Sequence, residues 1–175
     1  GLSRLSNHRV PATVKFATNF VPRTSGDLYL GYDPTVLPTP INYTNFSSIA
    51  GLNLVGVAAQ SGNVLRITPA ADTVSGDAWA QAKQYCARGF DTRFQFQYSN
   101  IGSRPGTTPG GDGVSFSIQN VGPTAPNVFG GLGNGANDVS VYFNGFWNWP
   151  GCSTCDVSGN SVGIVTNGQY VAQVD

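Results

Sequence analysis

The sequence predicts an all-β fold in which antiparallel strands pack as a sandwich. The chain has 23 Gly and 11 Pro among its 175 residues, a proportion typical of strands joined by many turns. All nine acidic residues are Asp and the chain contains no Met, so two strong helix formers, Glu and Met, are missing. Apolar and polar residues alternate with a period of two from residue 43 onward, and no segment offers the helical crossover that a parallel sheet requires.

The expected strands, in chain order, are residues 52–57, 64–68, 93–98, 114–119, 139–143, 162–165 and 169–173. In the third of these, Phe94, Phe96 and Tyr98 share one face, and the residues between them are polar. The other strands repeat this alternation. We therefore expect every strand to have one buried face and one solvent-facing face, as in an antiparallel sandwich.

Turn residues separate these strands. Residues 60–63 are expected to form the turn between the first two, and Asn167-Gly168 is typical of the two-residue turn of a hairpin. Residues 76–84 contain enough Ala and Gln to suggest a helix, but the surrounding residues favour a strand there.

Residues 1–42 are patterned more weakly than the remainder of the chain. A stretch at 10–20 is followed by repeated Pro and Gly, with a short strand expected at 26–31. We expect residues 1–42 to be an N-terminal extension that packs on, or swaps between, domains. Residues 43–175 then form the sandwich domain.

The charge composition argues against two classes of partner. Charged residues make up 10% of the chain, the formal net charge is zero, and Lys and Arg do not cluster. We therefore expect no nucleic-acid partner and no binding to an acidic membrane surface. No apolar run approaches the roughly 18 residues that cross a bilayer, so no membrane span is expected. Because the chain starts at Gly1 without a signal-peptide pattern, we expect a processed piece of a secreted or cell-surface protein.

Three cysteines and two glycosylation motifs fit such a compartment. Cys152 and Cys155 have the spacing of a redox pair, but turn residues flank them, so a loop-closing disulfide is expected. Cys86 would then be either a buried free thiol or a cysteine that forms a disulfide with another molecule. A zinc site would need four ligands, and the single histidine is distant in sequence. Asn42 and Asn45 each begin a glycosylation acceptor motif, although Asn-rich loops also produce such motifs by chance.

Three loops concentrate unusual residues: 109–113, 129–135 and 144–148, the last followed by Asp156. Asp112 before Gly113 is typical of a tight turn when considered alone. The glycine-rich loop at 129–135 does not precede a predicted helix, so it does not fit a phosphate-binding loop for a nucleotide. The side-chain oxygens of the third loop and of Asp156 suit calcium, although the spacing is not that of an EF-hand and turn-forming Asn is the alternative.

Considered together, these loops and the strands around them match one family in order and spacing. The matching blocks are Gly51-Leu-Asn-Leu-Val, Val64-Leu-Arg-Ile-Thr-Pro, Ser75-Gly-Asp-Ala-Trp, Gly89-Phe-Asp-Thr-Arg-Phe, Gly111-Asp-Gly-Val-Ser-Phe-Ser-Ile-Gln-Asn, Gly131-Leu-Gly and Val139-Ser-Val-Tyr-Phe-Asn-Gly-Phe-Trp-Asn. The segment 46–164 resembles the legume-type (L-type) lectin domain, especially its bacterial and secretory-pathway members.

The resemblance implies a concanavalin-like jelly roll with a carbohydrate site in the loops at one edge of its curved sheet. Asp112 would accept hydrogen bonds from two sugar hydroxyls and follow a cis peptide bond. The amide of Gly131 would donate to a sugar oxygen, as would the side chain of Asn148. Phe146 would stack on the apolar face of the sugar. Convergent hydrogen bonds and one aromatic plate suit a neutral polyol.

The metal positions of the family are altered in this chain. Three positions that hold a transition metal in the family read Tyr142, Asn144 and Ser161, so no transition metal is expected. The resemblance implies a calcium site of Asn144, the Phe146 carbonyl, Asn148 and Asp156. That set has one carboxylate where the family has two, which weakens calcium binding.

The family also has further strands after the hairpin at 167–168, whereas this chain ends at Asp175. We therefore expect a second chain, a cleaved C-terminal piece or a neighbouring copy in a homo-oligomer to complete the sandwich.

The function expected from these residues is carbohydrate binding, assisted by calcium, to neutral sugars of glycoprotein glycans. Glycoside hydrolases share the jelly roll, but their chemistry needs two carboxylates about 5–10 Å apart, and the strand that supplies them in related glucanases has no acid here. With one histidine, a Ser/His/Asp arrangement is also unsupported, and we expect no enzyme. The alternative is a structural protein on the same fold that assembles into a filament, sheath or surface layer.

Overall fold

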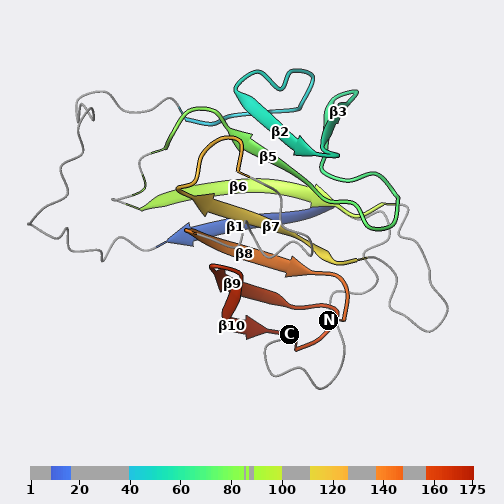
Figure 1. The fold of residues 1–175 in the computed structure, drawn as a ribbon, viewed down its shortest axis with the longest axis vertical. Helices are drawn as coiled ribbons and strands as arrows, with labels where there is room; N and C mark the ends of the chain where they lie inside the picture. Colours follow the sequence, from blue (N-terminus) through green and yellow to red (C-terminus); the bar gives the residue numbers. More distant parts are fainter. Residues whose placement is uncertain are drawn as a thin grey trace, which may run out of the picture.

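The computed structural model describes residues 9–16, 40–84, 86, 89–99, 111–125, 137–147 and 157–175. Within these ranges the regular elements are all β strands, as predicted, and no helix is present. The strands, drawn in Figure 1, are β1 (Arg9–Phe16), β2 (Leu52–Gly56), β3 (Ala59–Ser61), β4 (Val64–Arg66), β5 (Gly76–Ala80), β6 (Phe90–Gln97), β7 (Gly113–Gln119), β8 (Asp138–Asn144), β9 (Val162–Thr166) and β10 (Gln169–Val174).

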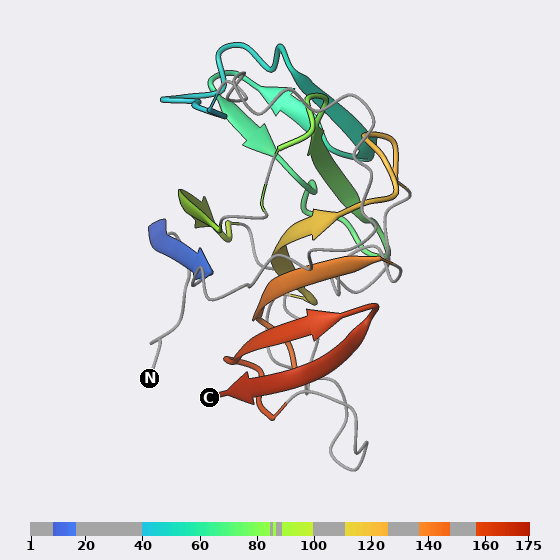
Figure 2. The ribbon, with the colours of Figure 1, turned by 90° about the vertical axis from the view of Figure 1, so that its left-hand side faces the viewer.

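All the strand pairs are antiparallel. The largest sheet has the order β10-β9-β8-β7, and three smaller pairs join β1 to β6, β2 to β5, and β3 to β4. Figure 2 shows the pair β1–β6 to one side of the four-stranded sheet, with the β2–β5 and β3–β4 pairs beyond its β7 edge. The four-stranded sheet therefore carries the predicted site strands.

The local prediction is confirmed at the turn between β9 and β10. Asn167 and Gly168 join β9 to β10 with φ angles of 50° and 75°, the left-handed values that a two-residue hairpin turn requires. The turn expected at residues 60–63 is shorter than predicted: residues 60 and 61 belong to β3, and residues 62–63 join β3, not the strand at 52–56, to β4. The segment 76–80 is a strand, as its neighbours indicated. Its partner, however, is β2, so the chain inserts the β3–β4 hairpin between two strands that pair with each other.

Part of the predicted N-terminal extension contributes a strand. β1 pairs with β6 along its whole length, from Arg9 opposite Gln97 to Phe16 opposite Phe90. The extension thus packs on the remainder of the chain through residues 9–16. The short strand expected at 26–31 lies outside the described residues.

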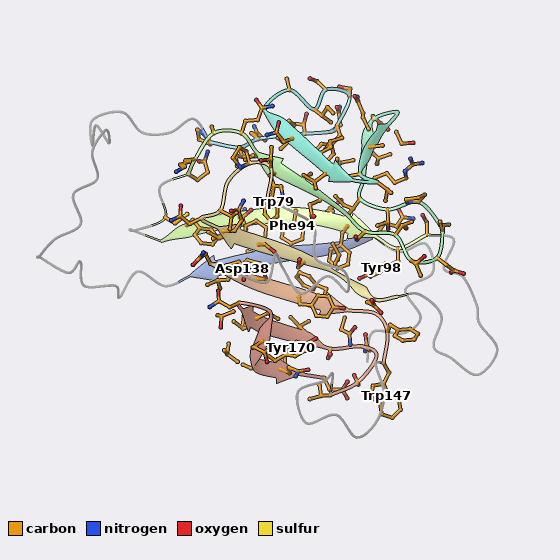
Figure 3. The ribbon with its side chains drawn as sticks, viewed as in Figure 1. Trp79, Phe94, Tyr98, Asp138, Trp147 and Tyr170 are labelled. Atoms are coloured by element: carbon orange, nitrogen blue, oxygen red, sulfur yellow. The ribbon has the colours of Figure 1, made fainter. Side chains whose placement is uncertain are left out.

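Aromatic rings connect β6 to the four-stranded sheet. The ring of Phe94 stacks on Phe116 of β7 with centroids 5.7 Å apart, and it meets Phe143 of β8 edge-on at 6.0 Å. Phe96 lies 5.0 Å from the same Phe143 ring. Offset and edge-on rings at such separations are favourable beyond the area they bury. The apolar faces of β6, β7 and β8 therefore pack together, as the alternation predicted (Figure 3).

The expectation of one solvent-facing side fails at β8. Ser140, Tyr142 and Asn144 lie on its polar face, yet they are only 0%, 1% and 5% exposed. Hydrogen bonds satisfy these groups: the Ser140 hydroxyl pairs with that of Ser117 at 2.7 Å and donates to Asp138 at 3.3 Å. The polarity of these residues therefore led to a wrong prediction of solvent exposure, because both faces of β8 are covered.

We expect Phe94→Ala to lower the free energy of unfolding by about 3 kcal/mol, because truncation leaves a cavity among the rings that join β6 to β7 and β8. Urea unfolding followed by circular dichroism measures this loss. The control is Gln95→Ala, an exposed neighbour on the other face of β6, which should change stability by less than about 0.5 kcal/mol. Equal losses in the two variants would contradict the packing described for β6.

Candidate functional site

The register of β7 and β8 brings two predicted site loops to the same end of the sheet. Gly113, the first residue of β7, lies opposite Asn144, the last residue of β8. Directly beyond this pair, the Gly145 amide donates a hydrogen bond to the backbone carbonyl of Asp112 at 3.0 Å. The loops that contain Asp112 and Phe146 therefore leave the sheet side by side.

Asp112 and Phe146 are the two predicted sugar-binding residues that the structure describes. Asp112 is half-buried, and the peptide bond between Gly111 and Asp112 is cis, as the resemblance implies. The Phe146 ring lies over Gly111, since a Cβ atom there would be 3.3 Å from its Cδ2 and Cγ atoms. The Phe146 ring and the backbone at residues 111–112, from distant parts of the sequence, thus come together.

Gly113 permits this arrangement because the backbone of β8 approaches it closely. A Cβ atom at Gly113 would lie 2.5 Å from the Phe143 carbonyl oxygen and 2.5 Å from Cε2 of Tyr142. Real side chains do not tolerate such contacts. The Tyr142 ring therefore fills the space beside Gly113.

Asn144 makes hydrogen bonds to three segments of the chain. Its Oδ1 atom accepts from the Tyr142 hydroxyl at 3.3 Å and from the Phe146 amide at 3.2 Å. Its Nδ2 group donates to the Ser158 carbonyl at 2.8 Å, and its backbone amide donates to the Ser161 carbonyl at 2.8 Å. We refer to these five residues as the Asn144 network.

The network bears on the calcium site that the resemblance implies. An amide oxygen has two lone pairs, and both of those on Asn144 accept hydrogen bonds from the protein. Asn144 therefore does not fit the role of calcium ligand. The described residues also contain no group of three or more His, Cys or Asp side chains that could hold a metal ion. Asn148 and Asp156, the other predicted side-chain ligands, lie outside the described residues.

Several further predicted residues also lie outside the described ranges. They are Gly131, which was expected to donate to a sugar, and the expected disulfide pair Cys152 and Cys155. Their roles stay predictions. Cys86 is described as a free, half-buried thiol, and burial raises its pKa, which lowers its reactivity at neutral pH.

Tyr98, which directly follows β6, reaches the site loops, a role that its place in the predicted alternating strand did not indicate. Its hydroxyl donates to the Phe143 carbonyl at 3.1 Å, and a Cβ atom at Gly145 would lie 3.6 Å from its ring. Burial raises the pKa of Tyr98 far above its ordinary value, although a hydrogen bond with the Val114 backbone acts in the opposite sense. The phenol therefore stays protonated and remains a donor.

Trp147 is a second aromatic residue in the 145–147 loop, and sequence reasoning gave it no role. Its side chain is 48% exposed, which is unusual for so large an apolar group. The loop backbone rests on Gly159, where a Cβ atom would lie 3.0 Å from the Trp147 amide nitrogen. Figure 3 shows Trp147 at the edge of the molecule.

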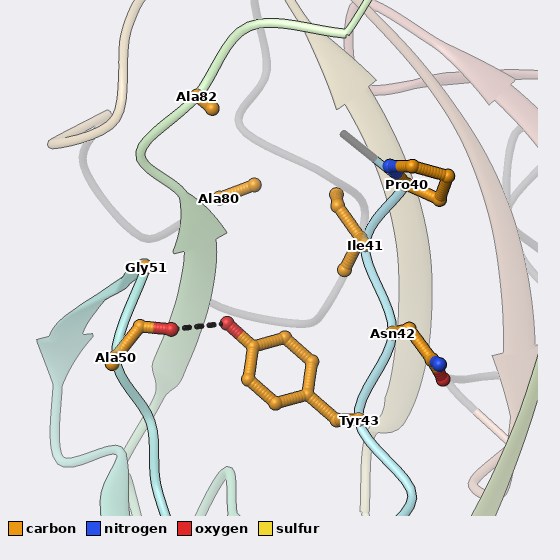
Figure 4. A pocket seen from close by; sticks show the side chains of 8 residues that line it. All are labelled: Pro40, Ile41, Asn42, Tyr43, Ala50, Gly51, Ala80 and Ala82. Carbon is orange, nitrogen blue, oxygen red and sulfur yellow. Dashed lines mark hydrogen bonds between the residues drawn. The ribbon is translucent and has the colours of Figure 1, made fainter. Parts of the chain in front are cut away.

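A hollow of about 230 Å³ lies elsewhere in the described structure (Figure 4). The Tyr43 hydroxyl donates to the Ala50 carbonyl across one side of it at 2.6 Å. None of the lining residues is charged, and none belongs to the predicted sugar or metal sets. They are Pro40, Ile41, Asn42, Tyr43, Ala50, Gly51, Ala80 and Ala82.

The two predicted glycosylation acceptors lie in the segment that begins at this hollow. Asn42 and Asn45 are both exposed. The Oδ1 atom of Asn45 accepts a hydrogen bond from the Ser47 amide at 2.9 Å, so the motif forms a turn stabilised by its own side chain. Their modification stays a prediction.

Asp77 of β5 is an acid that sequence reasoning overlooked. One of its carboxylate oxygens is buried and has no hydrogen-bond partner within the described residues. Burial raises the pKa of Asp77 above its ordinary value. An alternating pattern could not have revealed this, because the burial depends on which strand pairs with β5.

Comparison with known proteins adds no relative: the sequence matches no protein-family model, and no curated protein is significantly similar to it. Among the described residues, no helix is long and apolar enough to cross a membrane.

We expect Asp77→Asn to stabilise the protein at neutral pH by up to about 1 kcal/mol, a figure kept small because the group is only partly buried. A raised folded pKa means that the native state binds the proton more tightly. The contribution of Asp77 to the stability of the wild type is therefore most favourable below the ordinary pKa of 3.8 and is lost as the pH rises through the folded pKa. The difference between variant and wild type should vanish at about pH 3.

Urea unfolding at both pH values measures this effect. Asp72→Asn, at an exposed carboxylate, is the charge-matched control and should change stability little at either pH. A neutral-pH gain that is the same in both variants would show that net charge, and not the burial of Asp77, is responsible.

Proposed function

We propose that the protein is a carbohydrate-binding module of the L-type lectin kind, secreted or exposed at a cell surface, which binds neutral sugars of glycans. The observation that carries the proposal is the meeting of the Asp112 and Phe146 loops at the end of β7 and β8. The Phe146 ring lies against Gly111, directly before Asp112, and an aromatic ring and a carboxylate are the combination that the resemblance implies for a sugar site.

The strand arrangement supports the finer proposal of a concanavalin-like jelly roll. The four-stranded antiparallel sheet presents Phe116 and Phe143 to the rings of β6, which is the contact expected if two layers share one aromatic core. β1 widens the second layer by pairing with β6. In a β-sandwich, two sheets pack face to face through such contacts.

The chemistry of the two loops suits a neutral polyol. A carboxylate such as that of Asp112 can accept hydrogen bonds from two hydroxyl groups at once. The faces of Phe146 and Trp147 can cover the C–H side of a sugar ring, and the exposed Trp147 has surface to offer. A chain with 10% charged residues and no net charge offers little to an ionic ligand.

The same residues argue for binding without catalysis. Hydrolysis of a glycosidic bond uses two carboxylates about 5–10 Å apart across the scissile bond. The buried positions on the polar face of β8 next to the site are Tyr142 and Asn144, and neither is an acid. The described acids at this end of the sheet are Asp112 and Asp175, and the Asp175 carboxylate accepts a hydrogen bond from the Ser158 hydroxyl.

Assembly of copies is the second candidate function, and one observation favours it. Within the described ranges β10 pairs with β9 alone and lies at the edge of the four-stranded sheet. Val171 and Val174 on this strand are 61% and 64% exposed. An apolar strand edge of this kind is suited to pairing with another chain.

We expect Asp112→Asn to lower glycan affinity at least about tenfold, because hydrogen bonds to a charged acceptor contribute roughly 1.5–3 kcal/mol each. A glycan array of neutral oligosaccharides identifies a ligand, and titration calorimetry then measures its affinity. Asp91→Asn, which removes an exposed carboxylate on β6, is the matched control and should bind as wild type does.

Two results would count against this account. Undiminished affinity in Asp112→Asn would remove Asp112 from the site. A wild-type protein that binds no glycan on the array and sediments as a large oligomer would favour assembly over carbohydrate binding.

A further inference from the structure

The 145–147 loop is held at its base by uncharged hydrogen bonds. Asn144 is 5% exposed, and its side chain bonds to the Tyr142 hydroxyl, to the amide of Phe146 and to the Ser158 carbonyl. The Ser161 hydroxyl donates to the same Ser158 carbonyl at 3.3 Å. The side-chain amide of Asn144 thus connects the end of β8 to the 145–147 loop and to the segment before β9.

The orientation of these bonds opposes a cation at Asn144. Both donors at the amide oxygen, the Tyr142 hydroxyl and the Phe146 amide, direct their hydrogens toward Oδ1. A cation that coordinated Oδ1 would face these partially positive hydrogens and would have to displace at least one of them. Displacement would leave a buried donor unsatisfied, which is costly in a site this enclosed.

Tyr142 also argues against a cation here, because its ring occupies the volume next to the side-chain amide of Asn144. It is 1% exposed, lies against Gly113, and has its centroid 6.2 Å from that of Tyr170. A phenol is a poor ligand for a hard cation compared with a carboxylate. Its position on the sheet therefore serves packing and hydrogen-bond donation.

From this geometry we propose that the Asn144 network takes the place of a bound cation, so that the site loops keep their arrangement and bind sugar without calcium. The inference rests on the proposed carbohydrate-binding function and departs from the calcium assistance that the resemblance implies. Asn144 and Tyr142 are positioning residues: neither is expected to touch sugar.

The network acts on the sugar site through the Phe146 backbone. Oδ1 of Asn144 holds the Phe146 amide, and the ring of that residue lies over Gly111 beside Asp112. The Gly145 amide fixes the opposite loop through the Asp112 carbonyl. Loss of the Asn144 amide would therefore loosen the aromatic face relative to the carboxylate.

Thermal unfolding of the whole chain in CaCl2 and in EDTA tests the structural half of the proposal. Wild type should melt at the same temperature in both solutions. Asn144→Asp replaces the donor that faces the Ser158 carbonyl with an oxygen, so its Tm should fall by at least about 3 °C in EDTA. Asn63→Asp, at an exposed turn position, is the control for the added charge and should melt as wild type does. A wild-type Tm that rises in CaCl2 and returns in EDTA would overturn the proposal.

Glycan affinity under the same two conditions tests the functional half. Wild type should bind its array-selected neutral oligosaccharide equally in CaCl2 and EDTA. Tyr142→Phe keeps the ring but removes one donor, so it should fold and bind roughly threefold to tenfold more weakly, with no recovery in CaCl2. Recovery in CaCl2, or wild-type binding that EDTA abolishes, would overturn calcium independence while leaving carbohydrate binding intact. If wild type binds no glycan in either solution, the proposed function fails, and the melting comparison still decides whether a cation holds the loop.

Discussion

The antiparallel register of β7, β8 and β9 determines where every described site residue lies. It sets Gly113 opposite Asn144, and the backbone amide of Asn144 donates to the carbonyl of Ser161, just before β9 begins. Side chains alternate between the two faces of a strand, so a shift of one residue in β8 would turn Asn144 toward the aromatic layer. The hydrogen bonds to Phe146 and Ser158 would then be lost. The site loops depend on this register more than on any single contact of their own.

Interactions on both faces of β8 enforce that register. On one face Phe143 packs among the rings of β6, and on the other Ser140 is bonded to Ser117 of β7. Burying the polar face would be costly if its groups lacked partners, but the hydroxyls and the Asn144 amide are bonded to one another and to the backbone. The side chain of Asn144 and its hydrogen-bond partners are uncharged, so this part of the face holds the loop without the desolvation cost that a buried charge carries.

The sequence was sufficient where local chemistry decides the structure. The Asn167-Gly168 turn and the aromatic face of β6 follow from residue type and from the period of two, and both are present. The meeting of Asp112 with Phe146 was implied by the resemblance and not by spacing.

The features that could not be predicted depend on contacts between segments that are distant in the sequence. The pairing of β2 with β5 depends on a choice between distant strands. Ser140 looks solvent-facing in a one-dimensional pattern, because nothing local reveals that both sides of β8 are covered. The oxygen of Asn144 looks like a metal ligand in sequence, and only the positions of Tyr142 and Phe146 show that its lone pairs are already used.

The central claim is that sugar binds between the 111–113 and 145–147 loops without a metal ion. An NMR titration of the isotope-labelled chain in EDTA tests it most directly, with neutral monosaccharides such as mannose and galactose as probes and backbone amide shifts as the readout. The account predicts saturable shifts for residues 111–113 and 145–147, with the amides of β10 unchanged. Shifts confined to the hollow at residues 40–43 and 50–51, or no saturable shift for any neutral sugar, would contradict it.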